Sequence, residues 1–129
     1  MIVQDLSDDL RVSNIQLNGS ISAREFADYQ QSVIARNNTE QWASFVDCSL
    51  LTALDLNFER ISGHADSVNR LNSGRRPGFT EIIFAPTDLG FGIARMYQTL
   101  ADGQFEVRVF RTIEAAQEAL AVLLDGDAA

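Results

Sequence analysis

The stretch EIIFAPTDLGFGIARMYQTL (81–100) joins an apolar run to an amphipathic run, and this change of pattern decides the fold class. The run EIIFA (81–85) shows no alternation of polar and apolar residues, which is typical of a strand covered on both faces. The segment 88–102 then has apolar residues at helical spacing and ends before Gly103. We predict a central strand over Glu81–Ala85 and a covering helix after it, which indicates an α/β protein. The core stripe of that helix is predicted to consist of Leu89, Ile93, Met96, Tyr97 and Leu100.

Strand-like and helix-like segments alternate along the rest of the chain, and we predict a single domain over residues 1–129 with 125–129 as a frayed tail. Segment 105–110 alternates between apolar and polar residues, which favours an edge strand parallel to the central one. Segment 10–17 changes the parity of its apolar residues halfway, so we predict a bulge near Ser13–Asn14. The expected strands are 2–4, 10–17, 42–48, 80–85 and 105–110, segment 49–54 is a connection, and helices begin at Ser22, Asp55, Asp88 and Thr112.

Charge and composition narrow the set of partners. The formal net charge is −8, and all ten basic residues are arginine, so a nucleic-acid backbone would be repelled. The one compact basic cluster, GRRPG (74–78), is interpreted as a helix end. No segment approaches 18 apolar residues, which excludes a membrane span, and the N-terminus lacks a signal-peptide pattern. With Cys48 as the only cysteine, we expect a reducing compartment and a cytoplasmic location.

Two glycines one residue apart, Gly90 and Gly92, follow the central strand and raise the question of a phosphate-binding turn. The dinucleotide fingerprint needs a third glycine where this chain has Arg95, and it needs an acidic residue about 20 positions further on, which is absent. A Walker loop is excluded because the chain has no lysine. We interpret the glycines as positions where the start of the helix packs closely against a neighbour, and we expect no nucleotide cofactor.

The start of this helix is instead our candidate interaction surface. Phe91 and Arg95 are four residues apart and lie off the predicted core stripe. Aromatic and arginine side chains are enriched at interface hot spots. Asp88 would occupy the positive end of the helix dipole and would repel an incoming anion. The predicted surface consists of Asp88, Gly90, Phe91, Gly92 and Arg95.

The inventory of reactive side chains indicates that the protein is not an enzyme. His64 is the only histidine and falls near the apolar stripe of the second helix, so we interpret it as structural. Cys48 ends a buried strand and is interpreted as a small hydrophobic residue. No histidines or cysteines have the spacing of a zinc site, and we expect no metal and no catalytic residue.

Two segments resemble a known family. APTDLGFGIARMYQTL (85–100) and FEVRVFRTIEAAQEAL (105–120) resemble the C-terminal half of small bacterial SpoIIAA-like proteins, a STAS-type group also described as STAS/SEC14-like. IQLNGSIS (15–22) and FVDCS (45–49) are similar as well, so the resemblance covers about residues 10–124. It implies a curved β/α superhelix with a mixed sheet of about five strands and four main helices.

The resemblance also implies a function, with one departure from the family pattern. Its best understood members are anti-sigma-factor antagonists, which bind a partner kinase and are switched by phosphorylation of a serine that follows an aspartate at the start of the second helix. Asp55 matches that aspartate, but Leu56 and Asn57 occupy the serine positions. We therefore expect an interaction module without this switch, which forms a homodimer or binds a regulatory protein through residues 86–97.

An alternative function is suggested by the SEC14-like relatives of the family. It is a carrier of a small apolar ligand in a pocket under helix 88–102. The predicted lining of that pocket is Phe84, Phe91, Met96 and Phe110.

Overall fold

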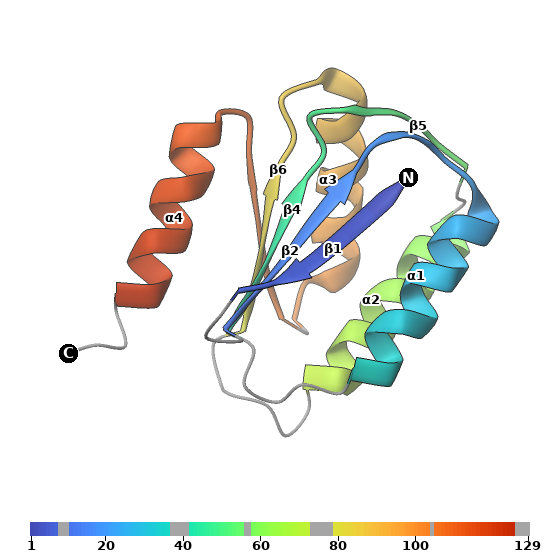
Figure 1. Cartoon of the computed structure of the whole chain (residues 1–129), viewed down its shortest axis with the longest axis horizontal. Coiled ribbons are helices and arrows are strands. Elements are labelled where there is room, and N and C mark those ends of the chain that lie inside the picture. Colours follow the sequence, from blue (N-terminus) through green and yellow to red (C-terminus); the bar gives the residue numbers. More distant parts are fainter. Residues whose placement is uncertain (8–10, 37–41, 56–57, 73–78, 104, 126–129) are drawn as a thin grey trace.

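The computed structural model of the chain describes residues 1–7, 11–36, 42–55, 58–72, 79–103 and 105–125. The basic cluster at 74–78, the serine positions at 56–57 and the tail at 126–129 lie outside these residues. A mixed sheet with helices on both faces forms the described part (Figure 1). The predicted α/β architecture, with about five strands in one mixed sheet and four helices, is confirmed.

The main sheet has the strand order β1-β2-β4-β6-β7. Only β1 is antiparallel to its neighbour, and the other pairs are parallel, as alternating strands and helices require. Strand β6 is paired on both sides and β7 on one side, which confirms the predicted interior and edge positions. The strand bounds are β1 Ile2–Leu6, β2 Val12–Leu17, β4 Ala43–Asp47, β6 Thr80–Phe84 and β7 Glu106–Phe110.

A second, two-stranded sheet was not predicted. It pairs β3 (Gly19–Ile21) with β5 (Leu51–Leu54) in parallel, with a register shift between Gly19 and Ser20. Segment 49–54 is therefore partly a strand rather than a connection only. Strands of three or four residues are too short to show a period, which explains why the pattern did not reveal them.

The helices divide unequally between the two faces of the sheet (Figure 1). Side chains of α1 (Ala23–Arg36), α2 (Phe58–Asn72) and α3 (Asp88–Ala101) share one large hydrophobic core with the sheet. On the opposite face, α4 (Ile113–Asp125) packs over a small core of Ile82, Ala116 and Ala119, joined by half-buried residues such as Phe84 and Phe110. Strand β6 is buried by both layers, as its unbroken apolar run predicted.

Side-chain caps fix three of the helix starts. The Ser22 hydroxyl accepts a hydrogen bond from the Glu25 N–H at 3.1 Å, as a capping box requires. The Glu25 carboxylate, however, accepts from the Ile2 N–H at 2.7 Å and so ties α1 to the first strand. Thr87 caps α3 through the Gly90 N–H at 3.1 Å, and Thr112 accepts from the Ala115 N–H at 3.3 Å. Both caps precede the first helical residue, where orphan N–H groups need acceptors.

Two sequence expectations are wrong, and a third is not tested. Strand β2 keeps a continuous register with both of its neighbours, so there is no bulge at Ser13–Asn14; Val12 and Ser13 are both buried, one on each face of the sheet. The predicted helix start at Asp55 stays a prediction, because residues 56–57, between it and α2, lie outside the described residues. Leu89 is 44% exposed and lies outside the core side of α3, whereas the predicted Ile93, Met96 and Leu100 pack against the main core and Tyr97 is buried in it.

Candidate functional site

The two glycines at the start of α3 have different roles. An added Cβ at Gly90 would lie 3.2 Å from the Thr87 hydroxyl oxygen and 3.5 Å from the Cys48 Cβ, so the glycine lets α3 approach the end of β4. An added Cβ at Gly92 would meet nothing within 4 Å. The interpretation of close packing therefore holds for Gly90 and fails for Gly92, which is exposed.

Arg111, a residue that the sequence did not single out, organises the candidate interaction surface. Its guanidinium donates to the Asp88 carboxylate at 2.7 Å and to the Pro86 carbonyl at 3.0 Å. It also lies over the Phe91 ring, 4.7 Å from the ring centroid. Phe91 is half-buried against the main core, so its outer side is covered by Arg111 rather than open to solvent. Arg111 and Asp88 are 23 residues apart in sequence, so the spacing of residues along the chain did not predict their contact.

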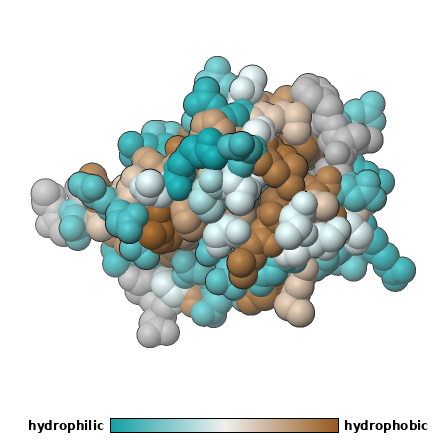
Figure 2. Space-filling model, turned by 90° about the horizontal axis from the view of Figure 1, so that it is seen from above, coloured by the Kyte–Doolittle hydropathy of each residue, from teal (hydrophilic) through white to brown (hydrophobic). Residues whose placement is uncertain are grey.

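Exposed residues complete this surface. Arg95 is exposed on α3, and Leu89, in the first turn of the same helix, is a large apolar side chain that is 44% exposed. Figure 2 views the molecule from the end where β2, β4 and β6 finish, and it shows hydrophobic surface exposed between hydrophilic residues. Apolar side chains beside a guanidinium form the kind of mixed surface that protein partners recognise.

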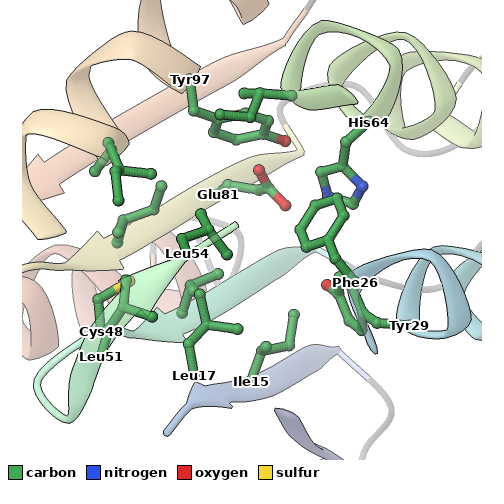
Figure 3. Close-up of a pocket in the computed structure, with 15 residues that line it drawn as sticks. Ile15, Leu17, Phe26, Tyr29, Cys48, Leu51, Leu54, His64, Glu81 and Tyr97 are labelled. Atoms are coloured by element: carbon green, nitrogen blue, oxygen red, sulfur yellow. The ribbon is translucent and has the colours of Figure 1, made fainter. Parts of the chain in front are cut away.

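A cavity of ≈ 80 Å³ lies beneath α3, between this helix, α1, α2 and the sheet. Its walls are mainly apolar and include Ile15, Leu17 and Leu51 (Figure 3). None of the four side chains that the sequence placed around such a pocket lines it. Phe84 and Phe110 pack with the small core under α4, on the far face of the sheet, because neighbouring strand residues alternate between faces. Phe91 and Met96 pack against the main core outside the cavity.

Glu81 lines this cavity from strand β6 and is 4% exposed. Burial raises the pKa of its carboxyl to about 7, and the nearby Tyr97 hydroxyl acts in the opposite direction. Tyr97 is itself buried, and its hydroxyl makes no hydrogen bond of good geometry. Its pKa is raised well above the usual value, first by burial and then by the Glu81 charge. The sequence carried one signal for this group: a glutamate inside an otherwise apolar strand run.

His64 reaches the same cavity from α2 and is 7% exposed. Its ring centroid lies 5.0 Å from that of Phe26, 5.7 Å from that of Tyr29 and 5.8 Å from that of Tyr97. Burial lowers the pKa of the imidazole to about 4, so it is neutral at physiological pH, and its Nδ1 has no hydrogen-bond partner. The histidine is a buried member of an aromatic cluster, as a structural role predicts.

Cys48 lines the opposite, apolar part of the cavity wall. Burial, with a smaller contribution from the Asp47 charge, raises the pKa of its thiol to about 12. The thiol is therefore protonated at neutral pH, and a protonated thiol is a poor nucleophile. This chemistry fits the interpretation of Cys48 as a small hydrophobic residue.

The described residues form neither a cluster of metal ligands nor a membrane-spanning helix. No three histidine, cysteine or acidic side chains there come together in a group that could hold a metal ion. Within the same ranges, every helix is too short or too polar to cross a bilayer.

Comparison with known proteins identifies the fold. No family model matches this sequence, and no curated protein matches it either. Among solved structures, the chain is similar to the anti-sigma factor antagonist SpoIIAA in its unphosphorylated form, with a TM-score of 0.63 and 11% identity over 96% of this chain and 98% of that one. An uncharacterized protein of the DUF3478 family from Shewanella loihica PV-4, with a SpoIIAA-like fold, gives a TM-score of 0.53 and 17% identity over 93% of this chain and 92% of that one.

A third solved structure is an anti-sigma factor antagonist from Mycobacterium paratuberculosis. Its TM-score is 0.50, and it is 17% identical over 94% of this chain and 93% of that one. All three likenesses extend over nearly the full length of both chains, so they concern the whole fold rather than a shared motif. This chain has the SpoIIAA-like, STAS-type fold that its sequence resembles.

Proposed function

We propose that this chain is a STAS-like regulatory module that binds a protein partner through the surface at the start of α3. The observation that carries the proposal is the fold itself, because two of the three similar structures are anti-sigma factor antagonists. Fold alone does not determine function, so the proposal also needs a site on this chain.

The start of α3 supplies that site. The ion pair between Asp88 and Arg111 is exposed, with the Asp88 side chain 96% accessible, so it contributes little to stability. It does hold the Arg111 guanidinium over Phe91 and gives this end of the sheet a defined shape. Leu89 and Arg95 extend the surface outward from there. A partner that fits would present an apolar patch to Leu89 and a carboxylate to the Arg95 guanidinium.

Binding without the family's phosphorylation switch is part of the proposal. Leu56 and Asn57 carry no hydroxyl group, so neither can accept a phosphoryl group where the antagonists carry their serine. This point rests on the sequence, because both residues lie outside the described ranges. We infer that partner binding is controlled by the partner's abundance or by another input.

A role without catalysis, in the cytoplasm, completes the proposal. Two observations support it: the imidazole of His64 is buried and neutral, and the thiol of Cys48 is buried and protonated. Neither is poised as the base or nucleophile of an acyl-transfer or phosphoryl-transfer site. A second copy of this chain is the alternative partner for the same surface, since two-fold assemblies are the commonest oligomers.

The test compares one double variant with one control. Proteins captured from a lysate by the wild-type chain would be purified, and their affinity for each variant would be measured by calorimetry. Leu89→Ala combined with Arg95→Ala should raise the Kd by about tenfold or more, the effect of losing a hot spot. The control, Val122→Ala, changes a 63% exposed side chain on α4 and should leave the Kd unchanged.

Equal binding by wild type and the double variant would contradict the proposed surface. Light scattering decides the homodimer alternative: a mass twice that of the chain, reduced by the double variant but not by Val122→Ala, would assign the surface to self-association. Circular dichroism of each variant verifies that the fold is retained.

A second candidate function is a carrier of a small ligand, and the cavity beneath α3 is the specific observation that favours it. The alternative derived from the sequence was a wholly apolar ligand. A cavity wall that contains a buried carboxyl group suits a ligand with one polar group better than a hydrocarbon.

A further inference from the structure

We propose that the cavity beneath α3 is a binding site for a small primary ammonium ion, of the size of ethylammonium or propylammonium, with the Glu81 carboxylate as its counter-charge. This inference goes beyond partner binding and concerns a different part of the molecule from the α3 start.

The polar groups of the cavity gather at one end of it (Figure 3). The Glu81 carboxyl, the Tyr97 hydroxyl and the His64 ring point toward one another there, from β6, α3 and α2 respectively. All three side chains are more than nine-tenths buried. The other end is formed by Leu17, Cys48 and Leu51 and is apolar. The site is thus suited to a molecule with one polar head and a short apolar tail.

Among the described residues, no positively charged side chain lines the cavity around Glu81. The cavity lining within the described residues contains no arginine, and the chain has no lysine. The other titratable groups that line it are His64 from α2, Tyr29 from α1, Tyr97 from α3 and Cys48 after β4. None of these carries a positive charge at neutral pH, since the imidazole is neutral. A buried carboxylate without a positive counter-charge is costly, so it favours taking up either a proton or a cation from outside.

The hydrogen-bonding groups favour an ammonium over an alcohol. An ammonium has three N–H donors and no acceptor, whereas an alcohol has one donor. The site offers the Glu81 carboxylate, the oxygen of the Tyr97 hydroxyl beside it, and the His64 Nδ1, which has no hydrogen-bond partner. A neutral imidazole with its proton on Nε2 accepts at Nδ1. Three acceptors from three elements therefore match the three donors of one ammonium.

Aromatic rings beside the polar end add to this preference. Phe26, Tyr29 and Tyr97 surround His64 at centroid distances between 5.0 and 5.8 Å, and all three line the cavity. Ring faces attract organic cations, and the attraction is greater where water is excluded. The net charge of −8 also raises the concentration of cations near the protein.

Volume sets the length of the ligand. An engineered cavity of about 150 Å³ holds benzene, so a cavity of ≈ 80 Å³ holds about three or four non-hydrogen atoms. Ethylammonium and propylammonium have this size, with the alkyl chain directed toward Leu17 and Leu51. Longer straight-chain amines would have to displace the wall.

The experiment is a titration of the ¹⁵N-labelled protein with propylammonium chloride at pH 8, followed by NMR and calorimetry. We expect saturable binding, with shifts at residues 64, 81 and 97. Propanol and propionate, matched in size but lacking the positive charge, should bind at least about tenfold more weakly. Sodium chloride at equal concentration is the control for ionic strength.

Variants connect the binding to individual groups. Glu81→Gln should lower the affinity by about tenfold or more, and Tyr97→Phe should lower it several-fold while keeping the carboxylate. Val122→Ala, on the far side of the sheet, should bind like wild type. Cys48→Ala enlarges the apolar end and should allow butylammonium to bind. Circular dichroism verifies the fold of each variant.

The pH dependence gives an independent readout. The pKa of Glu81 is about 7, and that of an alkylammonium is about 10, so the charged pair exists between these values. Affinity should therefore fall as the pH is lowered from 8 to 6, with a smaller change in Glu81→Gln. The proposal is overturned if propanol binds as tightly as propylammonium, if Glu81→Gln keeps the affinity, or if the shifts equal those caused by sodium chloride.

Discussion

The two faces of the main sheet are built differently, and strand β6 contributes to both. Toward α4 it presents Ile82, which is 1% exposed and packs with Ala116 and Ala119 in a small apolar core. Toward α1, α2 and α3 it presents Ile83 in the large core and Glu81 in the cavity wall. The α4 face is mainly apolar, with Thr80 of β6 as a small buried polar residue on it. The other face keeps a cavity and buried polar groups that apolar burial does not explain, so it is the face to search for function.

The largest expected effect comes from placing a second charge in the large core, beside the cavity. Ile83 is 5% exposed within β6, which is paired on both sides. Ile83→Asp should prevent folding, because an unpaired carboxylate would be buried there. The control Ile83→Val should cost only about 1 kcal/mol. The measurement is thermal unfolding by circular dichroism, and an unchanged melting temperature in Ile83→Asp would show that the strand is not interior.

The next effect tests whether Glu81 costs stability on the cavity face. Its folded pKa is about 7 against an ordinary value of 4.5, so the folded state holds the proton more tightly than the unfolded state. The stability that this group contributes is present at low pH and is lost as the pH rises from 4.5 through 7. The loss is about 3 kcal/mol at pH 8, since one pKa unit is about 1.4 kcal/mol.

Glu81→Gln should therefore be more stable than wild type at pH 8. The difference in unfolding free energy between the two proteins should be smaller at pH 4.5. His64 acts in the opposite direction: its lowered pKa makes stability fall as the pH drops from 6.5 toward 4. In Glu81→Gln, the loss of stability at low pH caused by His64 should remain, and the loss at high pH caused by Glu81 should be absent. Urea unfolding at several pH values measures both effects, and an identical pH profile for wild type and variant would contradict the burial of an unpaired carboxyl.

A smaller effect separates the cavity from the partner surface. Cys48→Ala and His64→Gln should each cost about 1–2 kcal/mol of stability and leave protein-partner binding unchanged. Both side chains are buried and contribute nothing to the exposed surface at the start of α3. Calorimetry with the purified partner measures the Kd, and denaturant unfolding measures the cost. Loss of partner binding in a well-folded variant would mean that the cavity and the surface act as one site.

The sequence predicted the layers of this protein better than its sites. Long segments such as 81–100 show their period clearly, and the strand β6 and the helix α3 were predicted within a few residues. The short strand β5 and the regular register of β2 were missed, because three or four residues show no period and because paired neighbours fix the register.

Candidate sites depend on contacts between distant segments, and these were harder to predict. The contact of Arg111 with Asp88 and Phe91 joins the residue after β7 to the start of α3. The cavity joins Glu81 to His64 and Tyr97 across three elements. The pocket predicted under α3 exists with a different lining, because Phe84 and Phe110 point to the opposite face of the sheet.

The smallest expected effect distinguishes the two glycines that first drew attention to α3. Gly92 is exposed, and an added Cβ there meets nothing within 4 Å, so Gly92→Ala should stabilise the helix by about 0.5–1 kcal/mol through its lower unfolded-state entropy. Gly90→Ala should gain less or lose stability, because its Cβ would lie 3.2 Å from the Thr87 capping oxygen. Melting temperatures of the two variants test this difference, and equal shifts would contradict the close packing assigned to Gly90. Partner binding adds a second readout: if the partner's backbone approaches α3 at Gly92, the stabilised Gly92→Ala variant should bind more weakly, whereas an unchanged Kd would move the contact toward Leu89 and Arg95.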